Sequence, residues 1–122
     1  MAVTNIEHAL IHSAIFMEGH RLHAEVRTLT GATDLAADCA PVQYLDPGGA
    51  TRTVDLPAME NGTVLIIINT ADAAEDLTVR NESDATVGTV SGSAGGTTNE
   101  VGYFHRVAGA WRVMHTFARV AN

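Results

Sequence analysis

From Val26 onward, hydrophobic and polar residues alternate in short runs that turn-forming residues separate. Within 51–56, Val54 and Leu56 are expected to face inward, while the polar residues between them face outward. The run 63–69 is apolar at most positions, which is typical of a central strand that is buried on both faces. Runs spaced about 8 to 12 residues apart predict an all-β domain, and we expect an antiparallel β-sandwich or a jelly-roll.

Turn-forming residues mark the ends of these runs. Asp-Pro-Gly-Gly at 46–49 suits a tight turn, because proline presets φ and glycine adopts positive φ. Asn-Gly at 61–62 suits a tight reversal into the apolar run. Gly88 interrupts the alternation of 86–90 and indicates a β-bulge. The stretch 91–99 is rich in Gly, Ser and Thr, and we expect a flexible loop because it has no large side chain to pin it.

The last two strands are predicted to form a hairpin through Ala108-Gly109-Ala110. Alternation assigns four residues to one face of each strand. On the first strand these are Val101, Tyr103, His105 and Val107, and on the second they are Trp111, Val113, His115 and Phe117. We expect Trp111 to anchor the core rather than to stack on a sugar ring.

The first 27 residues differ in character from the rest. Thr4 and Glu7 fit a capping box, and apolar residues then recur at intervals of three and four, which predicts a helix over 5–17. The continuous apolar run 14–17 is also compatible with a strand. We therefore expect an N-terminal arm or short helix over 1–27, followed by a β-sandwich domain over 28–122. The periodic apolar residues are Ile6, Leu10, Ala14 and Met17.

Composition narrows the classes of partner. Hydrophobic residues make up 46% of the chain and charged residues 17%, which excludes wholesale disorder. The chain has no lysine and a net charge of −7, so it lacks the clustered cations that phosphates require, and nucleic acid is not expected as a partner. No apolar run approaches the roughly 20 residues of a membrane span, and the start lacks a basic region. We expect a protein made in the cytoplasm, with no membrane partner.

Six histidines are many for this length, and they are the main candidates for metal ligands. His8 and His12 would share one face of a helix, and His20, His23 and Glu25 are able in principle to supply three ligands. No HExxH motif is present, and neither is the spaced His-x-His and Glu pattern of metal-binding cupins. We therefore expect no metal site, and surface or interface histidines instead. Histidines buried between subunits would weaken assembly when protonated near pH 6.

Candidates for nucleophilic or acidic chemistry are also weak. Cys39 is the only cysteine, and no basic group lies near it in the sequence to lower the pKa of its thiol. Ser91 and Ser93 lack the G-x-S-x-G elbow of hydrolases. The acidic cluster at 72–76 suits a solvated turn better than a calcium loop. We expect no catalytic residue and no cofactor, and hence a protein that is not an enzyme.

Two motifs lie in the middle of the chain. The first is Ala-Pro-Val-Gln-Tyr-Leu-Asp-Pro-Gly-Gly-Ala-Thr-Arg-Thr-Val-Asp-Leu-Pro at 40–57, and the second runs from Gly62 through Asn69-Thr-Ala-Asp to Leu77-Thr-Val. A Gly-Ala-Trp hairpin at 109–111 follows them. Together they resemble small β-rich structural proteins of tailed bacteriophages. The resemblance covers roughly residues 40–113, and head decoration proteins, head fibres and tail-fibre modules share it.

The resemblance implies a virion structural protein, and the size of the chain fits a head decoration (cement) protein best. Such proteins are typically homotrimers that bind the capsid exterior and bridge neighbouring subunits of the major capsid protein. The N-terminal segment would then clamp the shell or a sister subunit. The residues expected to make this contact are Ile6, Leu10, Ile15, Phe16 and Met17.

Two alternatives remain open from the sequence. One is a tail-fibre or spike module that binds a host receptor or glycan, with loop 91–99 facing the receptor. The other, less favoured, is a metal-dependent cupin-like enzyme.

Overall fold

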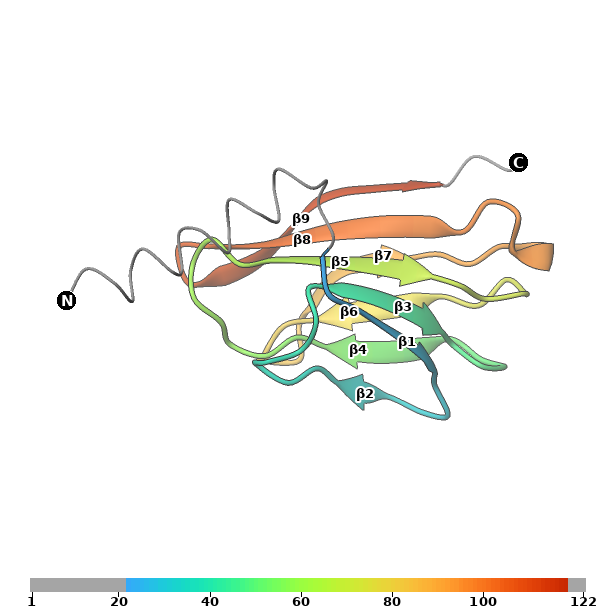
Figure 1. Ribbon diagram of the computed structural model, residues 1–122, viewed down its shortest axis with the longest axis horizontal. Helices are drawn as coiled ribbons and strands as arrows, with labels where there is room; N and C mark the ends of the chain where they lie inside the picture. The colour runs from blue at the N-terminus through green and yellow to red at the C-terminus, as the bar shows by residue number, and fades with distance from the viewer. Residues whose placement is uncertain (1–21, 119–122) are drawn as a thin grey trace, which may run out of the picture.

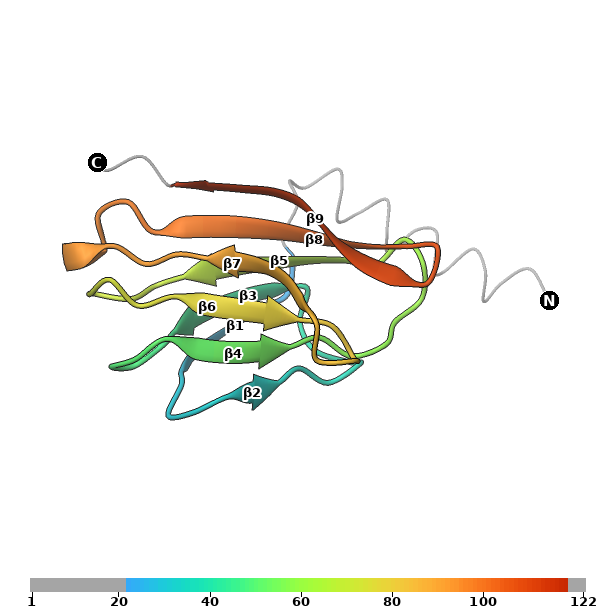
Figure 2. The ribbon, with the colours of Figure 1, turned by 180° about the vertical axis from the view of Figure 1, so that it is seen from behind.

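The computed structural model describes residues 22–118, which form two β-sheets packed face to face (Figure 1). Sheet A has five strands in the order β1-β3-β5-β8-β9, and sheet B has four in the order β2-β4-β6-β7. Figure 2 shows the molecule from the side of sheet B. The strands are β1 (Ala24–Thr28), β2 (Thr33–Asp34), β3 (Val42–Asp46), β4 (Arg52–Asp55), β5 (Val64–Asn69), β6 (Leu77–Arg80), β7 (Thr86–Val90), β8 (Glu100–Val107) and β9 (Ala110–Ala118), with a short 3-10 turn, η1 (Ala94–Gly96), between β7 and β8.

Both sheets mix parallel and antiparallel pairs. In sheet A, β1, β3 and β5 run parallel, while β8 and β9 join them antiparallel. In sheet B, β2, β4 and β6 run parallel and β7 is antiparallel. The prediction of an all-β antiparallel β-sandwich or jelly-roll is therefore wrong. The predicted arm or helix over 5–17 lies outside the described residues, whereas β1, which includes the end of the range 1–27, belongs to sheet A.

The parallel pairs arise because the chain passes from one sheet to the other after each of its first five strands. It visits sheet A at β1, β3 and β5 and sheet B at β2, β4 and β6, so successive strands of one sheet point the same way. We call each passage from a strand of sheet A through sheet B and back to sheet A a coil. The coils differ in length: Ala24 pairs with Val42, 18 positions later, and Val42 pairs with Ile66, 24 positions later. This inequality explains why no repeat is visible in the sequence.

The sequences predicted to make tight reversals are instead corners between the sheets. The Asp-Pro-Gly-Gly stretch carries the chain from β3 in sheet A to β4 in sheet B, and Asn61-Gly62 lies on the return from β4 to β5. Gly48 has φ of +73°, and its Cα packs so closely on the Leu29 carbonyl that a Cβ would collide with it. Glycine at this corner therefore allows the first two coils to stack.

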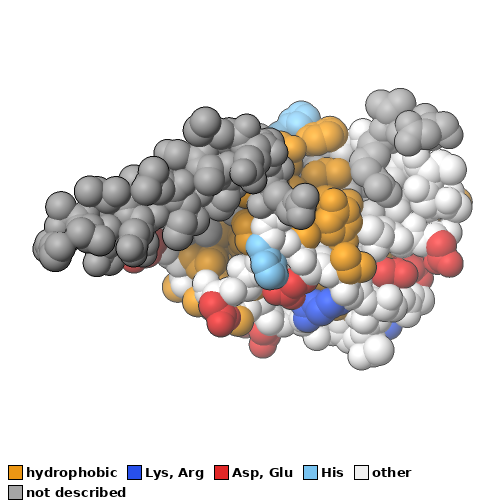
Figure 3. Space-filling view, viewed as in Figure 1, with side chains coloured by type: hydrophobic (Ala, Val, Ile, Leu, Met, Phe, Trp, Pro, Cys, Tyr) orange, Lys and Arg blue, Asp and Glu red, His pale blue; other side chains and the backbone are white. Residues whose placement is uncertain are grey.

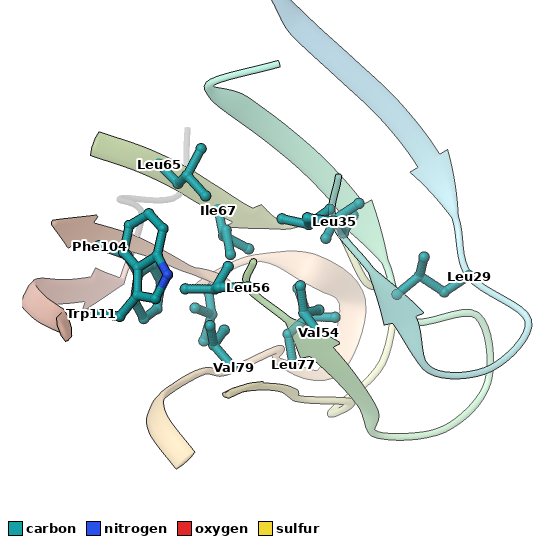
Figure 4. Close-up of a cluster of buried hydrophobic side chains, with 12 residues drawn as sticks. Leu29, Leu35, Val54, Leu56, Leu65, Ile67, Leu77, Val79, Phe104 and Trp111 are labelled. Atoms are coloured by element: carbon teal, nitrogen blue, oxygen red, sulfur yellow. The ribbon is translucent and has the colours of Figure 1, made fainter. Parts of the chain in front are cut away.

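The main hydrophobic core lies between the two sheets (Figure 4). β5 is the middle strand of sheet A, which confirms the prediction of a central strand. Gly102 on β8 leaves space for its neighbours, since a Cβ there would lie 2.7 Å from the Phe104 ring and 2.8 Å from a Val90 methyl group. The buried side chains of this main core are Leu29, Leu35, Leu45, Val54, Leu56, Leu65, Ile67, Leu77, Val79, Val90, Phe104 and Trp111.

A polar link also joins the two sheets. Arg106 on β8 donates two hydrogen bonds, of 2.9 and 2.7 Å, to the carboxylate of Glu82 in the loop between β6 and β7. The guanidinium lies 5.8 Å from the ring centre of Trp111, whose Nε1 donates to the Pro57 carbonyl at 2.8 Å. The hydrogen bonds from Arg106 lower the pKa of Glu82. Trp111 is thus a core anchor, as predicted.

Two bulges change which side chains face the core. The bulge in β7 leaves Val87 without a partner beside Gly88, where the alternation is broken. In β9, Met114 is the extra residue, because Phe104 pairs with Val113 and Tyr103 with His115.

The β9 bulge overturns the prediction that four alternating residues share one face of the last strand. Trp111 and Val113 pair with inward-facing residues of β8, whereas His115 and Phe117 pair with outward-facing ones. An extra residue shifts the alternation by one position and so reverses every side chain that follows it.

Candidate interaction surface

The outer faces of the two sheets differ in chemistry. The residues of sheet B that point away from sheet A are polar, and two of them form an ion pair: Arg80 donates to the Asp55 carboxylate at 2.7 and 2.9 Å. These hydrogen bonds lower the pKa of Asp55. Sheet B therefore turns a polar face to solvent, although most of its strands are parallel. The outward residues of its strands are Asp34, Thr53, Asp55, Thr78, Arg80, Thr86 and Thr89.

The residues of sheet A that point away from sheet B are mainly apolar or aromatic, and we call this set the outer face. Strand register aligns ten of them in two adjacent rows that cross all five strands. Figure 3 shows hydrophobic side chains gathered on this side of the molecule. The first row is Val26, Tyr44, Ile68, Val101 and Phe117, and the second is Ala24, Val42, Ile66, Tyr103 and His115.

The outer face has a cluster of its own, separate from the core. Val42, Ile68 and Val101 are buried there, and Tyr44, Ile66 and Tyr103 pack against them. Toward the edges the side chains are open: Val26 is 78% exposed and Phe117 is 38% exposed. Among the described elements, none packs against this face. An apolar sheet face with exposed side chains at both edges is typical of a site of contact with another segment or molecule.

Aromatic rings gather at the β8–β9 side of the outer face. The rings of Tyr103 and Phe117 meet edge to face with centroids 5.7 Å apart, and His115 stacks on Phe117 at 5.3 Å. Such pairs hold the rings in fixed orientations. The outer face therefore presents a preformed apolar surface on strands of the scaffold.

The predicted contact residues Ile6, Leu10, Ile15, Phe16 and Met17 lie outside the described residues. The same holds for the histidines at positions 8, 12 and 20.

The histidines within the described range do not come together. His23 and His115 are exposed, and His105 is half-buried on β8. Over residues 22–118, no group of three His, Cys, Asp or Glu side chains is arranged to hold a metal ion. The candidate set of His20, His23 and Glu25 is only partly within that range.

Cys39 is half-buried and is not activated. Burial raises the pKa of its thiol, and the carboxylates of Glu25 and Asp38 raise it further. Arg27 opposes this shift, so the fold brings to Cys39 a basic group that the local sequence does not show, but its effect on the pKa is smaller than those of burial and the carboxylates.

Two surface hollows differ in the charge of their lining. One, of about 580 Å³, is lined by Ala and Met side chains, Thr63 and a single ionisable group, Glu60. The other, of about 310 Å³, is lined by four carboxylates, and those of Asp55 and Glu82 accept hydrogen bonds from arginines. These two carboxylates hold strands and loops together.

The Gly-rich loop 91–99 is pinned, contrary to the expectation of a loop with no anchoring side chain. Asn99 is 1% exposed, and its Nδ2 donates to the Ala71 carbonyl at 2.7 Å while its Oδ1 accepts from the Ser93 amide at 2.7 Å. Asn69 on β5 holds the facing loop, accepting from the Ala71 amide at 2.8 Å and donating to the Val90 carbonyl at 3.0 Å. Two buried asparagines therefore fix the loops at this end of the two packed sheets.

Sequence patterns missed the outer face as a candidate site, but one signal pointed to it. The alternate positions of β5, Val64, Ile66 and Ile68, are apolar although the inward positions already supply the core. A strand that is apolar on both faces needs cover on both.

No helix in the described part of the chain is long and apolar enough to cross a membrane. No protein-family model matches the chain, and no curated protein is significantly similar to it in sequence.

Proposed function

We propose that this protein is a non-enzymatic virion structural protein that binds the outside of a phage capsid. It would act as a homotrimer and stabilise the shell by bridging subunits of the major capsid protein. The observation that carries the proposal is the contrast between the polar outer face of sheet B and the apolar outer face of sheet A.

The outer face suits permanent contact with a protein. Interfaces that stay assembled are more apolar than ordinary surface, and charged residues are depleted at their centres. The two rows on sheet A contain no Asp, Glu, Lys or Arg. Burying apolar surface stabilises an assembly by about 25 cal/mol per Å². Many copies on one shell would multiply this contribution.

The resemblance over residues 40–113 directs the proposal to a phage particle. That range includes β3, β5 and β8, which supply the middle of the outer face. A glycan-binding tail module is less well supported, because sugar sites combine an exposed aromatic ring with convergent polar groups. Trp111 is buried, the two tyrosines of the outer face pack into its apolar cluster, and Phe117 packs on other rings.

Binding to capsid shells tests the proposal. The shells are assembled from the major capsid protein of the same phage genome and lack this protein. Pelleting should show saturable binding at a multiple of three copies per local symmetry axis. Val26→Glu places a charge on the outer face and should weaken binding at least tenfold, because an unpaired charge is costly to bury. Thr89→Glu adds the same charge to sheet B and should bind like the unmodified protein.

Three outcomes would count against the proposal. Absence of saturable binding to the shells would refute the capsid role. Binding to a glycan array without binding to shells would support the tail-module alternative. Equal binding by the two glutamate variants would show that the outer face is not the contact surface.

A further inference from the structure

The corner between β4 and β5 contains the only asparagine in the sequence that glycine follows, Asn61-Gly62. In a chain that is free to move, such a pair loses its side-chain amide readily, because glycine has no side chain to obstruct the approach of its own nitrogen. Asn61 and Gly62 are exposed, so burial does not keep water from them. Whether the amide is lost therefore depends on how the fold holds these two residues.

Loss of the amide begins with attack by the backbone nitrogen of Gly62 on Cγ of Asn61. The new nitrogen–Cγ bond replaces the bond from Cγ to Nδ2, and ammonia leaves with the proton of the Gly62 amide. Water then opens the five-membered succinimide ring at either carbonyl and leaves aspartate or isoaspartate. The attack requires the nitrogen and Cγ to lie about 3–3.5 Å apart, with the nitrogen on the same side of the backbone as Cβ.

The turn at this corner places the attacking nitrogen on the wrong side. The Thr63 amide donates to the Glu60 carbonyl at 3.2 Å, which closes a β-turn with Asn61 and Gly62 at its centre. Gly62 has φ of +93°, whereas φ of Asn61 is negative. These signs define a type II turn, whose first central residue has ψ of about +120°. At that angle the Gly62 nitrogen eclipses the α-hydrogen of Asn61 and lies away from Cβ, so the ring closes only after the peptide rotates.

Two hydrogen bonds to the β8–β9 hairpin oppose this rotation. Asn61 Oδ1 accepts from the Gly109 amide at 2.8 Å, which holds the side chain toward the hairpin. The Gly62 amide donates to the Arg106 carbonyl at 2.8 Å, so the proton that the attacking nitrogen must lose is already engaged. Each bond favours the closed arrangement by about fivefold. Attack therefore requires a local opening in which both bonds break.

We propose that Asn61 is a deamidation site that the fold keeps unreacted, and that loss of its amide records opening of the turn at Asn61-Gly62. The site belongs to the free protein and is independent of the proposed function. Aspartate at position 61 would retain the bond from the Gly109 amide, because a carboxylate is also an acceptor. Isoaspartate would lengthen the main chain by one atom and would displace the turn from Arg106.

Peptide mapping by mass spectrometry tests the proposal on the full chain. The protein is incubated at pH 7.5 in buffer and in guanidinium chloride, and amide loss is followed at each asparagine. In the denaturant, Asn61 should react faster than the other asparagines. In the folded protein it should react more than about tenfold more slowly than in the denaturant, because two bonds of about fivefold each must break. A smaller ratio would overturn the proposal.

Thr63→Val separates the turn from the rest of the fold. Thr63 Oγ1 donates to the Glu60 carbonyl at 2.7 Å, so the variant loosens the turn and leaves the core unchanged. Amide loss at Asn61 should rise about fivefold in the folded variant and stay the same in denaturant. The matched control is Thr97→Val, exposed in the loop 91–99 at the opposite end of β5, which should change neither rate. Equal folded rates in the two variants, with Trp111 fluorescence showing both cores intact, would overturn the role of the turn.

Discussion

Replacing Asn99 by alanine is the sharpest test of how the Gly-rich end of the sandwich is held. Asn99 is almost fully buried, and its side chain makes three hydrogen bonds. It donates to the Ala71 carbonyl at 2.7 Å, and it accepts from the amide and the hydroxyl of Ser93 at 2.7 and 3.1 Å. Asn99→Ala removes all three bonds and leaves their partners in place.

The expected cost follows from what is left unpaired. The Ala71 carbonyl belongs to a residue that is 2% exposed, and losing its partner costs about 1–3 kcal/mol. The Ser93 amide is only partly buried, so its loss adds about 1 kcal/mol. We expect a total near 3 kcal/mol, which corresponds to a fall of roughly 12 °C in Tm for a domain of this size.

Urea unfolding measures this cost. Trp111 is the only tryptophan and is buried, so its fluorescence reports loss of the core. Asn61→Ala is the matched control: Asn61 is exposed, and its Oδ1 accepts one hydrogen bond, of 2.8 Å, from the Gly109 amide. That variant should lose less than about 1 kcal/mol. Equal losses in the two variants at an unchanged m-value would refute the idea that the buried asparagine pins the loop.

Three further predictions concern packing, charge and the thiol. Gly102→Ala should lower the free energy of unfolding by about 1–3 kcal/mol, because the added methyl group overpacks the core. Gly31→Ala, with open space around it, should change this free energy by less than about 1 kcal/mol. Equal urea midpoints for the two variants would contradict this prediction. Because Arg80 lowers the pKa of Asp55, the extra stability that Asp55 confers is present at neutral pH and is lost as pH falls below about 4, through the lowered pKa. Thermal melts of Asp55→Asn should therefore differ from those of the unmodified protein at pH 7 and converge toward pH 2, and a constant gap would contradict the assignment. Cys39 should react with iodoacetamide more slowly in the folded protein than in urea at pH 7.5, because its raised pKa leaves less thiolate; equal rates would argue against that shift.

The strands from β3 onward were predictable from the sequence, because each depends on a local pattern, whereas most of β1 falls in the range predicted as an N-terminal arm or short helix. Alternation in 51–56 and the apolar run 63–69 correspond to β4 and β5, and β5 is central as expected. The β-bulge at Gly88 was also predictable, since the broken alternation is visible in the residues themselves. These features require no knowledge of which strand lies next to which.

Strand direction was not predictable, because it depends on the path of the chain between strands. A Pro-Gly-Gly or Asn-Gly turn has the same local chemistry whether it closes a hairpin or carries the chain to the opposite sheet. Here these turns carry the chain to the opposite sheet, and the resulting coils are 18 and 24 positions long in sheet A. Unequal coils leave no repeat from which parallel stacking could be inferred.

The candidate surface was only partly predictable, for a related reason. Nothing in the local sequence marks Met114 as the extra residue in β9; only the pairing with β8 shows it. Without the bulge, Phe117 would share the inner face with Trp111, and the row that begins at Val26 would lack its last member. A single register shift therefore places Phe117 on the outer face, whereas alternation alone would assign Phe117 to the core.

The need for a cover on sheet A comes from side chains and not from strand direction. Parallel strands are usually covered on both faces, but sheet B contains the same parallel arrangement of β2, β4 and β6 and turns polar residues to solvent. The backbone therefore tolerates an exposed parallel face in this protein. What distinguishes sheet A is that Ile66 and Ile68 occupy positions where sheet B has threonine and charged residues. A chain able to solvate one such face has no structural need for isoleucine on the other, so these residues are best explained by a contact that they make.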